Sequence, residues 1–145
     1  QLGDLTINVE NRSRLIRVIT ELDNYYLDCD MKKMPISLNH TERVLVVTGD
    51  VEQINYNDFL SFITIIKNND FWNSQITQIH FTEDNEMILI PRVGDHKVYF
   101  GKLDFMHEKL TNLYEFYLKI MPVKGWQTYS QISLKFNNQI VCKKK

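Results

Sequence analysis

The chain has 145 residues with 17 basic and 18 acidic side chains, so its formal net charge is −1. This length predicts one domain, or one domain with a fragment of another, that can build a core without disulfides or metal. The hydrophobic fraction of 43% and the charged fraction of 24% are typical of a globular protein. The balanced charge gives no sign of a nucleic-acid surface, and the basic run at residues 143–145 is interpreted as a solvated end.

No apolar run approaches the ~20 residues that a membrane-spanning helix needs. The chain begins with Gln1 rather than Met, so we expect a piece of a longer protein from which an anchor or targeting segment has been removed. The two cysteines, Cys29 and Cys142, cannot form a metal site alone, and we expect two free, buried thiols. A disulfide stays possible if the two Cα atoms lie within about 7 Å.

The first half of the chain predicts several strands, followed by one helix. Residues 5–9 alternate with period two, and residues 15–19, 25–28 and the β-branched run at 43–48 are also interpreted as strands. Pro35 keeps the piece at residues 34–37 out of a central strand. Asn55 or Asn57 can cap a helix that runs to about Asn68, whose apolar positions Phe59, Phe62, Ile63 and Ile66 recur at helical spacing. Residues 71–72 are expected to begin a connection to the next strands.

The second half predicts a three-strand meander, a helix and a final hairpin. The meander covers residues 75–82, 87–92 and 96–101. Asp104 can cap a second helix that extends to about Met121, with Met106, Leu110, Leu113, Tyr117 and Ile120 in one stripe. Residues 130–136 alternate cleanly, Asn137-Asn138 suits a tight turn, and residues 139–142 form the return strand.

This order of elements predicts an α+β fold. We expect a mostly antiparallel β-sheet with two main helices packed on one face, because runs of strands separated by single helices favour that arrangement. In the final hairpin Ile132, Leu134 and Phe136 share one face, so Phe136 is more readily explained as a core residue than as a contact residue. Trp126 and Tyr129 are expected to pack against the second helix.

The residues that usually carry chemistry are not arranged for it. None of the four histidines, His40, His80, His96 and His107, has ligand spacing to another His or Cys, and His80 and His96 are expected to be half-buried or at the surface. Nucleophile-elbow and phosphate-loop motifs are missing from the sequence. We therefore predict no catalytic residues, no metal and no cofactor, although carboxylates from distant strands could still meet in a cleft.

A set of short segments follows in a fixed order along the chain. They are residues 7–12, 15–18, 25–28, 34–37, 44–49, 78–79, 88–94, 96–98, 100–101, 109–110, 113, 116–117, 125–126, 129, 132–136 and 138–141. By their order and spacing over about residues 5–142, they resemble the extracytoplasmic part of the bacterial cell-division family FtsQ/DivIB, of the Bacteroidetes type. The chain departs from the family where a junction Pro is absent near Arg14, and where Lys32 or Lys33 stands in place of the Gly before Met34.

The resemblance implies a domain organisation, an address and partners. Residues 1–10 would be the last strand of a truncated POTRA domain, and residues 11–145 would be the FtsQ-type β-domain. The domain would lie on the periplasmic face of the inner membrane, held by a single N-terminal helix that this sequence lacks. It would act as a non-enzymatic scaffold of the divisome that binds FtsB- and FtsL-type proteins, and it would bind no nucleic acid.

The last strands carry the FtsB contact in the family, which implies a partner site here. Carried over by position, the site is Lys135, Phe136, Asn137, Asn138 and Gln139. The physical basis would be strand addition, in which an incoming segment satisfies the unpaired backbone groups of an edge strand. Lys135-Phe136 replaces the usual Arg-Tyr, and Lys is a weaker bidentate partner for a carboxylate than Arg.

Two other functions stay open at this level. The chain could be another extracytoplasmic, POTRA-associated adaptor in envelope assembly, which a downstream outer-membrane barrel would favour. It could also be an unrecognised enzyme, which a deep pocket with converging, perturbed carboxylates or histidines would favour.

Overall fold

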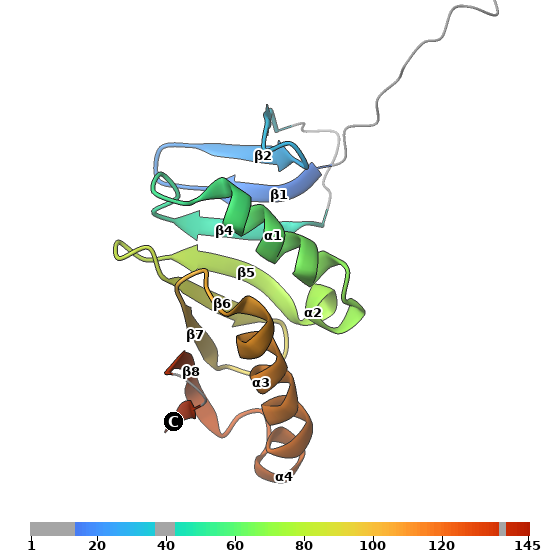
Figure 1. The fold of residues 1–145 in the computed structure, drawn as a ribbon, viewed down its shortest axis with the longest axis vertical. Helices are drawn as coiled ribbons and strands as arrows, with labels where there is room; N and C mark the ends of the chain where they lie inside the picture. The colour runs from blue at the N-terminus through green and yellow to red at the C-terminus, as the bar shows by residue number, and fades with distance from the viewer. Residues whose placement is uncertain (1–13, 37–42, 137–138) are drawn as a thin grey trace, which may run out of the picture.

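A computed structural model describes residues 14–36, 43–136 and 139–145. These residues form one nine-stranded sheet, in the order β3-β2-β1-β4-β5-β6-β7-β8-β9, with helices beside it (Figure 1). The strands are β1 Arg14–Ile19, β2 Asn24–Asp28, β3 Lys33–Met34, β4 Leu45–Gly49, β5 Ile76–Phe81, β6 Met87–Pro91, β7 Lys97–Gly101, β8 Tyr129–Phe136 and β9 Gln139–Lys144. The helices are α1 Tyr56–Lys67, α2 Asp70–Gln75, α3 Met106–Lys119 and α4 Met121–Lys124. Within the described ranges, no helix has the length and hydropathy to cross a membrane.

The α+β class is confirmed, but the sheet is mixed where a mostly antiparallel one was predicted. β1 pairs with β4, β4 with β5, and β7 with β8 in parallel, while the remaining pairs are antiparallel. Two of the parallel pairs are joined by helices, α1 and α2 between β4 and β5, and α3 and α4 between β7 and β8. A helical crossover returns the chain to the end of the sheet where it started, so the next strand must run parallel.

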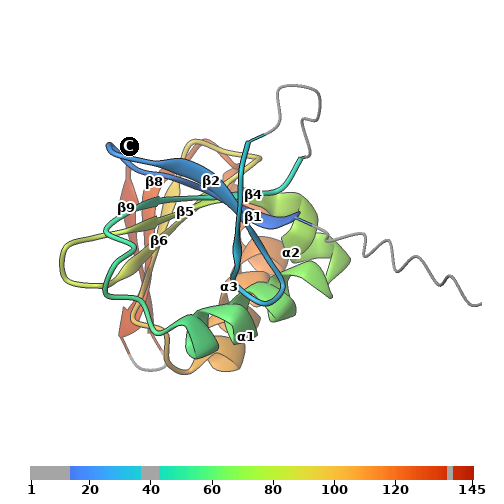
Figure 2. The same cartoon turned by 90° about the horizontal axis from the view of Figure 1, so that it is seen from above.

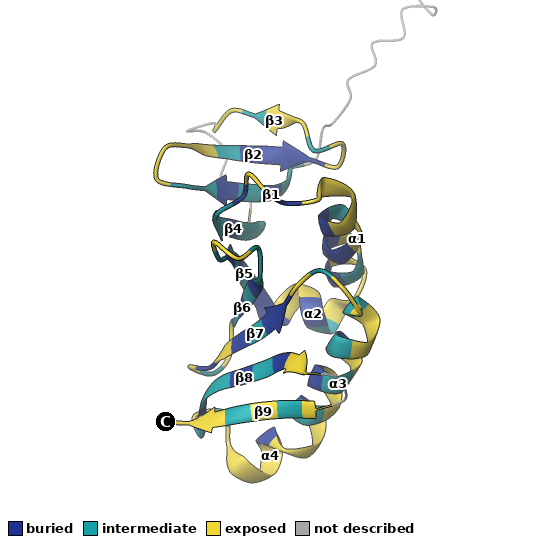
Figure 3. Cartoon of the chain, turned by 60° about the vertical axis from the view of Figure 1, so that its left-hand side comes forward, coloured by how far each residue is buried: buried dark blue, intermediate teal, exposed yellow. Residues whose placement is uncertain are grey.

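The helices cover one side of a curved sheet. Figure 2 shows α1, α2 and α3 gathered on the same side when the sheet is seen from above, and Figure 3 shows α1, α3 and α4 along it. The side chains of β6 follow this arrangement, because Met87 and Leu89 are buried whereas Ile88 and Ile90 are only partly buried. The second apolar face of β6 is therefore only partly covered.

The core is built mainly on the apolar face of α1, as the helical spacing predicted. Phe59, Phe62, Ile63 and Ile66 are all at most 1% exposed. The ring of Phe59 lies 5.2 Å from that of Phe81 in β5, and the ring of Phe62 lies 5.0 Å from that of Phe100 in β7, both edge to face. Burial of one such side chain contributes about 1.5–3 kcal/mol. Helix α1 therefore packs against both β5, in the middle of the sheet, and β7, in its C-terminal half.

Helix ends follow the sequence in one case and depart from it in another. The side chain of Asn55 caps α1 by accepting from the backbone N–H groups of Asn57 and Asp58. Asp104 does not cap α3, because its carboxylate accepts a hydrogen bond from Lys109 Nζ at 2.8 Å instead. The residue at the N-cap position is Phe105, which has φ of 48° and makes no side-chain cap.

The connection expected at residues 71–72 is in fact part of helix α2. Asn69 caps this short helix through a hydrogen bond from the backbone N–H of Trp72, at 3.1 Å. The rings of Phe71 and Tyr117 lie 6.0 Å apart, so α2 packs its aromatic residues against α3. This cap was visible in the sequence as the Asn two residues before Phe71.

His96 is buried at 2% exposed, where the sequence analysis expected a half-buried or surface position. Its Nε2 lies 2.8 Å from the hydroxyl of Tyr117, and its Nδ1 is buried with no hydrogen-bond partner among the described residues. The ring of Trp126 lies 6.2 Å from that of His96 and 5.0 Å from that of Tyr117. Burial lowers the pKa of His96 from its usual 6.5 to about 4, and Asp95 opposes that shift. The ring is therefore a neutral part of the core at neutral pH.

Replacing Gly49 with Ala is expected to destabilise the fold more than the same change at Gly125. Both glycines have positive φ, but a Cβ on Gly49 would lie 2.1 Å from the carbonyl oxygen of Phe81, whereas on Gly125 the nearest atom is 3.7 Å away. Gly49→Ala should lower the free energy of unfolding by about 1–3 kcal/mol more than Gly125→Ala. Both substitutions strain the backbone at positive φ, but only the Cβ at position 49 would also clash with a backbone atom. Urea unfolding of both variants measures the difference, and equal losses would contradict the clash.

His96 is expected to make the fold less stable as the pH falls. Its pKa is about 4 when folded and near 6.5 when unfolded, so the unfolded state binds more protons between these values and stability drops through that window. The melting temperature should therefore fall from pH 6.5 to 4, and the fall should be shallower in His96→Gln, which has no group to titrate there. An identical pH profile in the two proteins would show that His96 does not carry the effect.

Candidate functional site

The C-terminal strand β9 lies at one end of the sheet (Figure 3). It pairs with β8 alone, and among the described residues no strand lies on its other side. In an edge strand, every second residue points its backbone N–H and C=O groups outward, where only water or another chain can bind them. The open flank that strand addition requires is therefore present in this part of the chain.

The opposite end of the sheet is poorly suited to receive a strand. β3 has only two residues, Lys33 and Met34, and it is followed by Pro35. Short length, an edge lysine and a proline are the usual ways in which proteins block an edge. The two ends of the sheet therefore differ, and β9 is the longer and less protected one.

Strands β8 and β9 form a hairpin, called the ribbon below. Three of the five predicted contact residues lie on it. Lys135 and Phe136 are the exposed last residues of β8, and Gln139 is the exposed first residue of β9. Phe136 pairs with Gln139 across the hairpin, so the structure brings those two together. Asn137 and Asn138 lie outside the described residues.

Phe136 is 55% exposed, so its interpretation as a core residue is wrong. Ile132 and Leu134, which should share its face, are both buried. The reason is an irregular register between Ser133 and Phe136 in the pairing with β9. A bulge of this kind interrupts the alternation of side chains, so the residue beyond it no longer points into the core.

Lys135 is already engaged within the chain. Its Nζ lies 2.9 Å from Oε1 of Glu86, which precedes β6, and its side chain also lies beside Gly101. This ion pair is partly exposed and contributes at most about 1 kcal/mol. A partner carboxylate could therefore compete with Glu86 for Lys135 at little energetic cost.

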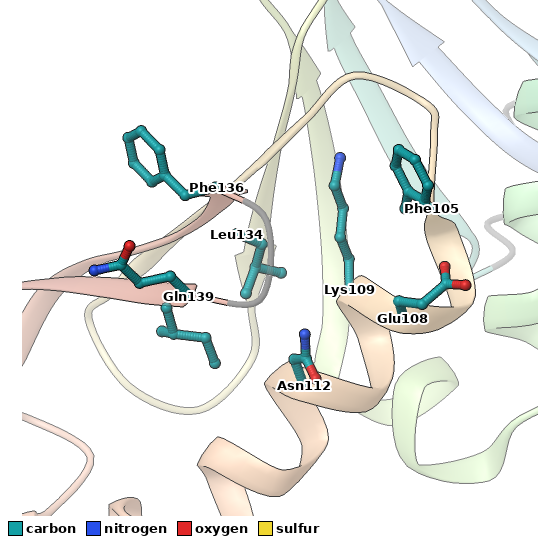
Figure 4. Close-up of a pocket in the computed structure, with 8 residues that line it drawn as sticks. Phe105, Glu108, Lys109, Asn112, Leu134, Phe136 and Gln139 are labelled. Carbon is teal, nitrogen blue, oxygen red and sulfur yellow. The ribbon is translucent and has the colours of Figure 1, made fainter.

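A cavity of about 320 Å³ opens between this ribbon and helix α3 (Figure 4). Its lining residues come from both elements: Phe105, Glu108, Lys109, Asn112, Leu134, Phe136, Gln139 and Ile140. A second cavity of about 250 Å³ shares Asn112 and Ile140 with the first and continues past Phe116 and Ile120. The two make a groove along α3 and β9 whose lining includes both apolar and charged side chains.

The α3 side of this groove was missed by the sequence analysis. Glu108, Asn112, Phe116 and Ile120 repeat every four residues and so form a second stripe beside the buried one. The four-residue spacing could have indicated this stripe. A stripe of mixed polarity nevertheless looks like an ordinary solvent-exposed face of a helix until a neighbouring strand is known to lie beside it.

The predicted packing of Trp126 and Tyr129 against α3 is confirmed. The ring of Trp126 lies 5.0 Å from that of Tyr117, and the ring of Tyr129 lies 5.7 Å from that of Phe116.

Both cysteines are free as expected, but neither is fully buried, although two buried thiols were predicted. Cys29 is exposed in the turn after β2, whereas Cys142 in β9 is partly buried. Burial raises the pKa of the Cys142 thiol, which makes it less reactive. In the described ranges, no three His, Cys, Asp or Glu side chains gather as a possible metal site.

The perturbed titratable groups that stand out lie in the core. His96 contacts Tyr117, which lies on the buried face of α3. Burial raises the pKa of the Tyr117 hydroxyl far above its usual value of 10.0. Neither lines the groove beside β9. The chemistry that the ribbon and groove offer is therefore recognition by backbone hydrogen bonds, apolar contact and charge.

Comparison with known proteins agrees with this architecture. A family model described as "FtsQ/DivIB, C-terminal related" matches residues 14–143, which is nearly the whole chain. No curated protein matches the sequence. The family is one of non-enzymatic scaffolds in bacterial cell division. The chain therefore belongs to the FtsQ/DivIB C-terminal related family.

Proposed function

We propose that this chain is the extracytoplasmic scaffold domain of a divisome protein, which recruits or bridges FtsB- and FtsL-type proteins through its C-terminal strands. The observation that carries the proposal is the unpaired outer edge of β9. Family membership supplies the cellular process, because the family relates the chain to bacterial cell division. The domain would work on the periplasmic face of the inner membrane, anchored by one N-terminal helix and preceded by a POTRA domain that ends near residue 10.

Binding would begin with main-chain hydrogen bonds along β9. A partner segment that lies beside this strand pairs its own N–H and C=O groups with the outward-pointing ones of residues 139–144. The sheet would gain a tenth strand at the end where it is open. Because these bonds involve backbone, they give affinity without demanding particular side chains in β9.

The groove under β9 would supply specificity. Ile140 and Cys142 are partly buried and pack at the margin of the core, so they mark the helix-facing side of β9. Side chains on the same side of an added strand would extend that layer over α3 and reach the cavities beside Asn112 and Phe116. Alternate residues of an added strand share one face, so an alternating apolar pattern in the partner fits this arrangement.

Charge would steer the encounter. Lys143 and Lys144 are exposed at the end of β9, and Lys135 lies at the far end of β8. An acidic partner segment would be attracted to this edge over roughly a Debye length of about 10 Å at moderate salt. Such attraction raises the association rate more than the affinity.

Replacing Phe136 with Asp is expected to weaken binding of an FtsB-type partner without unfolding the domain. Phe136 is 55% exposed and lines the groove, so the substitution removes a contact surface and few core contacts. We expect Phe136 to be one of the few contact residues whose loss costs more than about 1 kcal/mol, so affinity should fall by about tenfold. Leu22→Asp is the control, because Leu22 is 96% exposed in the turn between β1 and β2. Titration calorimetry that finds both variants unchanged would count against the site.

Hydrogen exchange should locate the added strand. When the partner binds, amides of β9 should exchange at least about tenfold more slowly, because they become hydrogen-bonded inside a sheet. Amides of β3, at the opposite end of the sheet, should keep their rates. Protection at β3 with none at β9 would reject strand addition at the C-terminal edge.

A further inference from the structure

A basic cleft of about 840 Å³ lies at the amino ends of three neighbouring parallel strands, β1, β4 and β5. Strands β6, β7 and β8 separate β5 from β9, so this cleft is distinct from the ribbon and its groove. β4 and β5 pair from Val46 with Gln78 onward, and Leu45 and Ile76 line the cleft ahead of that first pair. The end of α1 and the short helix α2 form its other wall.

The cleft concentrates positive charge in a chain whose net charge is −1. Arg43, Lys67 and Arg92 all line it, and among the described residues no carboxylate lines it. Within the described ranges none of the three forms an ion pair. Arg92 is held at the rim by a hydrogen bond from its Nε to the carbonyl oxygen of Ser74, at 2.8 Å. The rest of its guanidinium group is left to bind a ligand.

The floor of the cleft is apolar. Ile66 and Ile76 are buried, and Leu15 and Leu45 are partly buried while lining the opening. The volume falls in the range of about 300–1,000 Å³ that is usual for organic ligands, and it exceeds the need of a single inorganic anion. An apolar floor under a cationic rim suits a ligand that carries both apolar groups and carboxylates.

We propose that this basic cleft binds an acidic peptide segment of a partner protein, with carboxylates at Arg43, Lys67 and Arg92 and apolar side chains on the floor. Arginine favours this chemistry, because its planar guanidinium group can bind a carboxylate through two parallel hydrogen bonds. Three cations in a chain of net negative charge make too small a basic surface to follow a nucleic-acid backbone. The proposal is independent of strand addition at β9 and would give the domain a second contact with another polypeptide.

The test uses the 145-residue chain and a fluorescein-labelled octapeptide of alternating Glu and Leu. Fluorescence anisotropy should show saturable binding that weakens with added salt. The double variant Arg43→Gln/Arg92→Gln should bind about tenfold more weakly, since hydrogen bonds to charged groups each contribute severalfold in affinity. The matched control is Lys102→Gln/Lys124→Gln, which removes the same charge from exposed positions that line neither the cleft nor the groove beside β9, and it should change affinity by less than about twofold. Melting temperatures of both variants verify that they fold.

Three outcomes would overturn the proposal. Equal losses in the two double variants would mean that the peptide responds to the total charge of the chain and not to the cleft. Equally tight binding of a peptide with Lys in place of Glu would remove the role of carboxylates. Displacement of the acidic peptide by an equal concentration of inorganic phosphate would identify a simple anion site. Amide chemical-shift changes at Leu15, Leu45 and Thr77 in the unsubstituted chain are the expected positive result.

Discussion

The structure depends on burial of one face of a long sheet under helices that belong to different halves of the chain. The decisive contact is that of Phe62 in α1 with Phe100 in β7, at 5.0 Å between rings. Helix α1 follows β4 in the chain, yet it packs against a strand of the C-terminal half. Because both rings are fully buried, the two halves share one core, and β9 has a fixed position relative to that core.

An open sheet must end in two edges, and each edge exposes backbone groups that can pair with another chain. In this protein the N-terminal edge is a two-residue strand followed by Pro35, whereas the C-terminal edge is a six-residue strand. The asymmetry directs any added strand to β9. The bulge before Phe136 leaves that side chain outside the core, at the margin of the groove.

The proposed contacts occupy different parts of the same sheet. β9 and the groove along α3 offer backbone bonds and apolar contact, while the basic cleft offers three cations at the amino ends of the parallel strands. A scaffold that brings proteins together benefits from separate surfaces of different chemistry, because one partner then does not block the other.

The sequence by itself determined the α+β class, the face of α1, the final hairpin and the family, because these depend on local spacing and on the order of segments. Only the tertiary structure decided the parallel pairings, since strand direction follows from where a helical crossover returns the chain. It also decided the burial of His96, which was expected to be half-buried or at the surface, and the exposure of Phe136, which alternation had placed in the core. The groove and the basic cleft join residues that are far apart in sequence, such as Arg43 with Arg92, and no local pattern encodes that proximity.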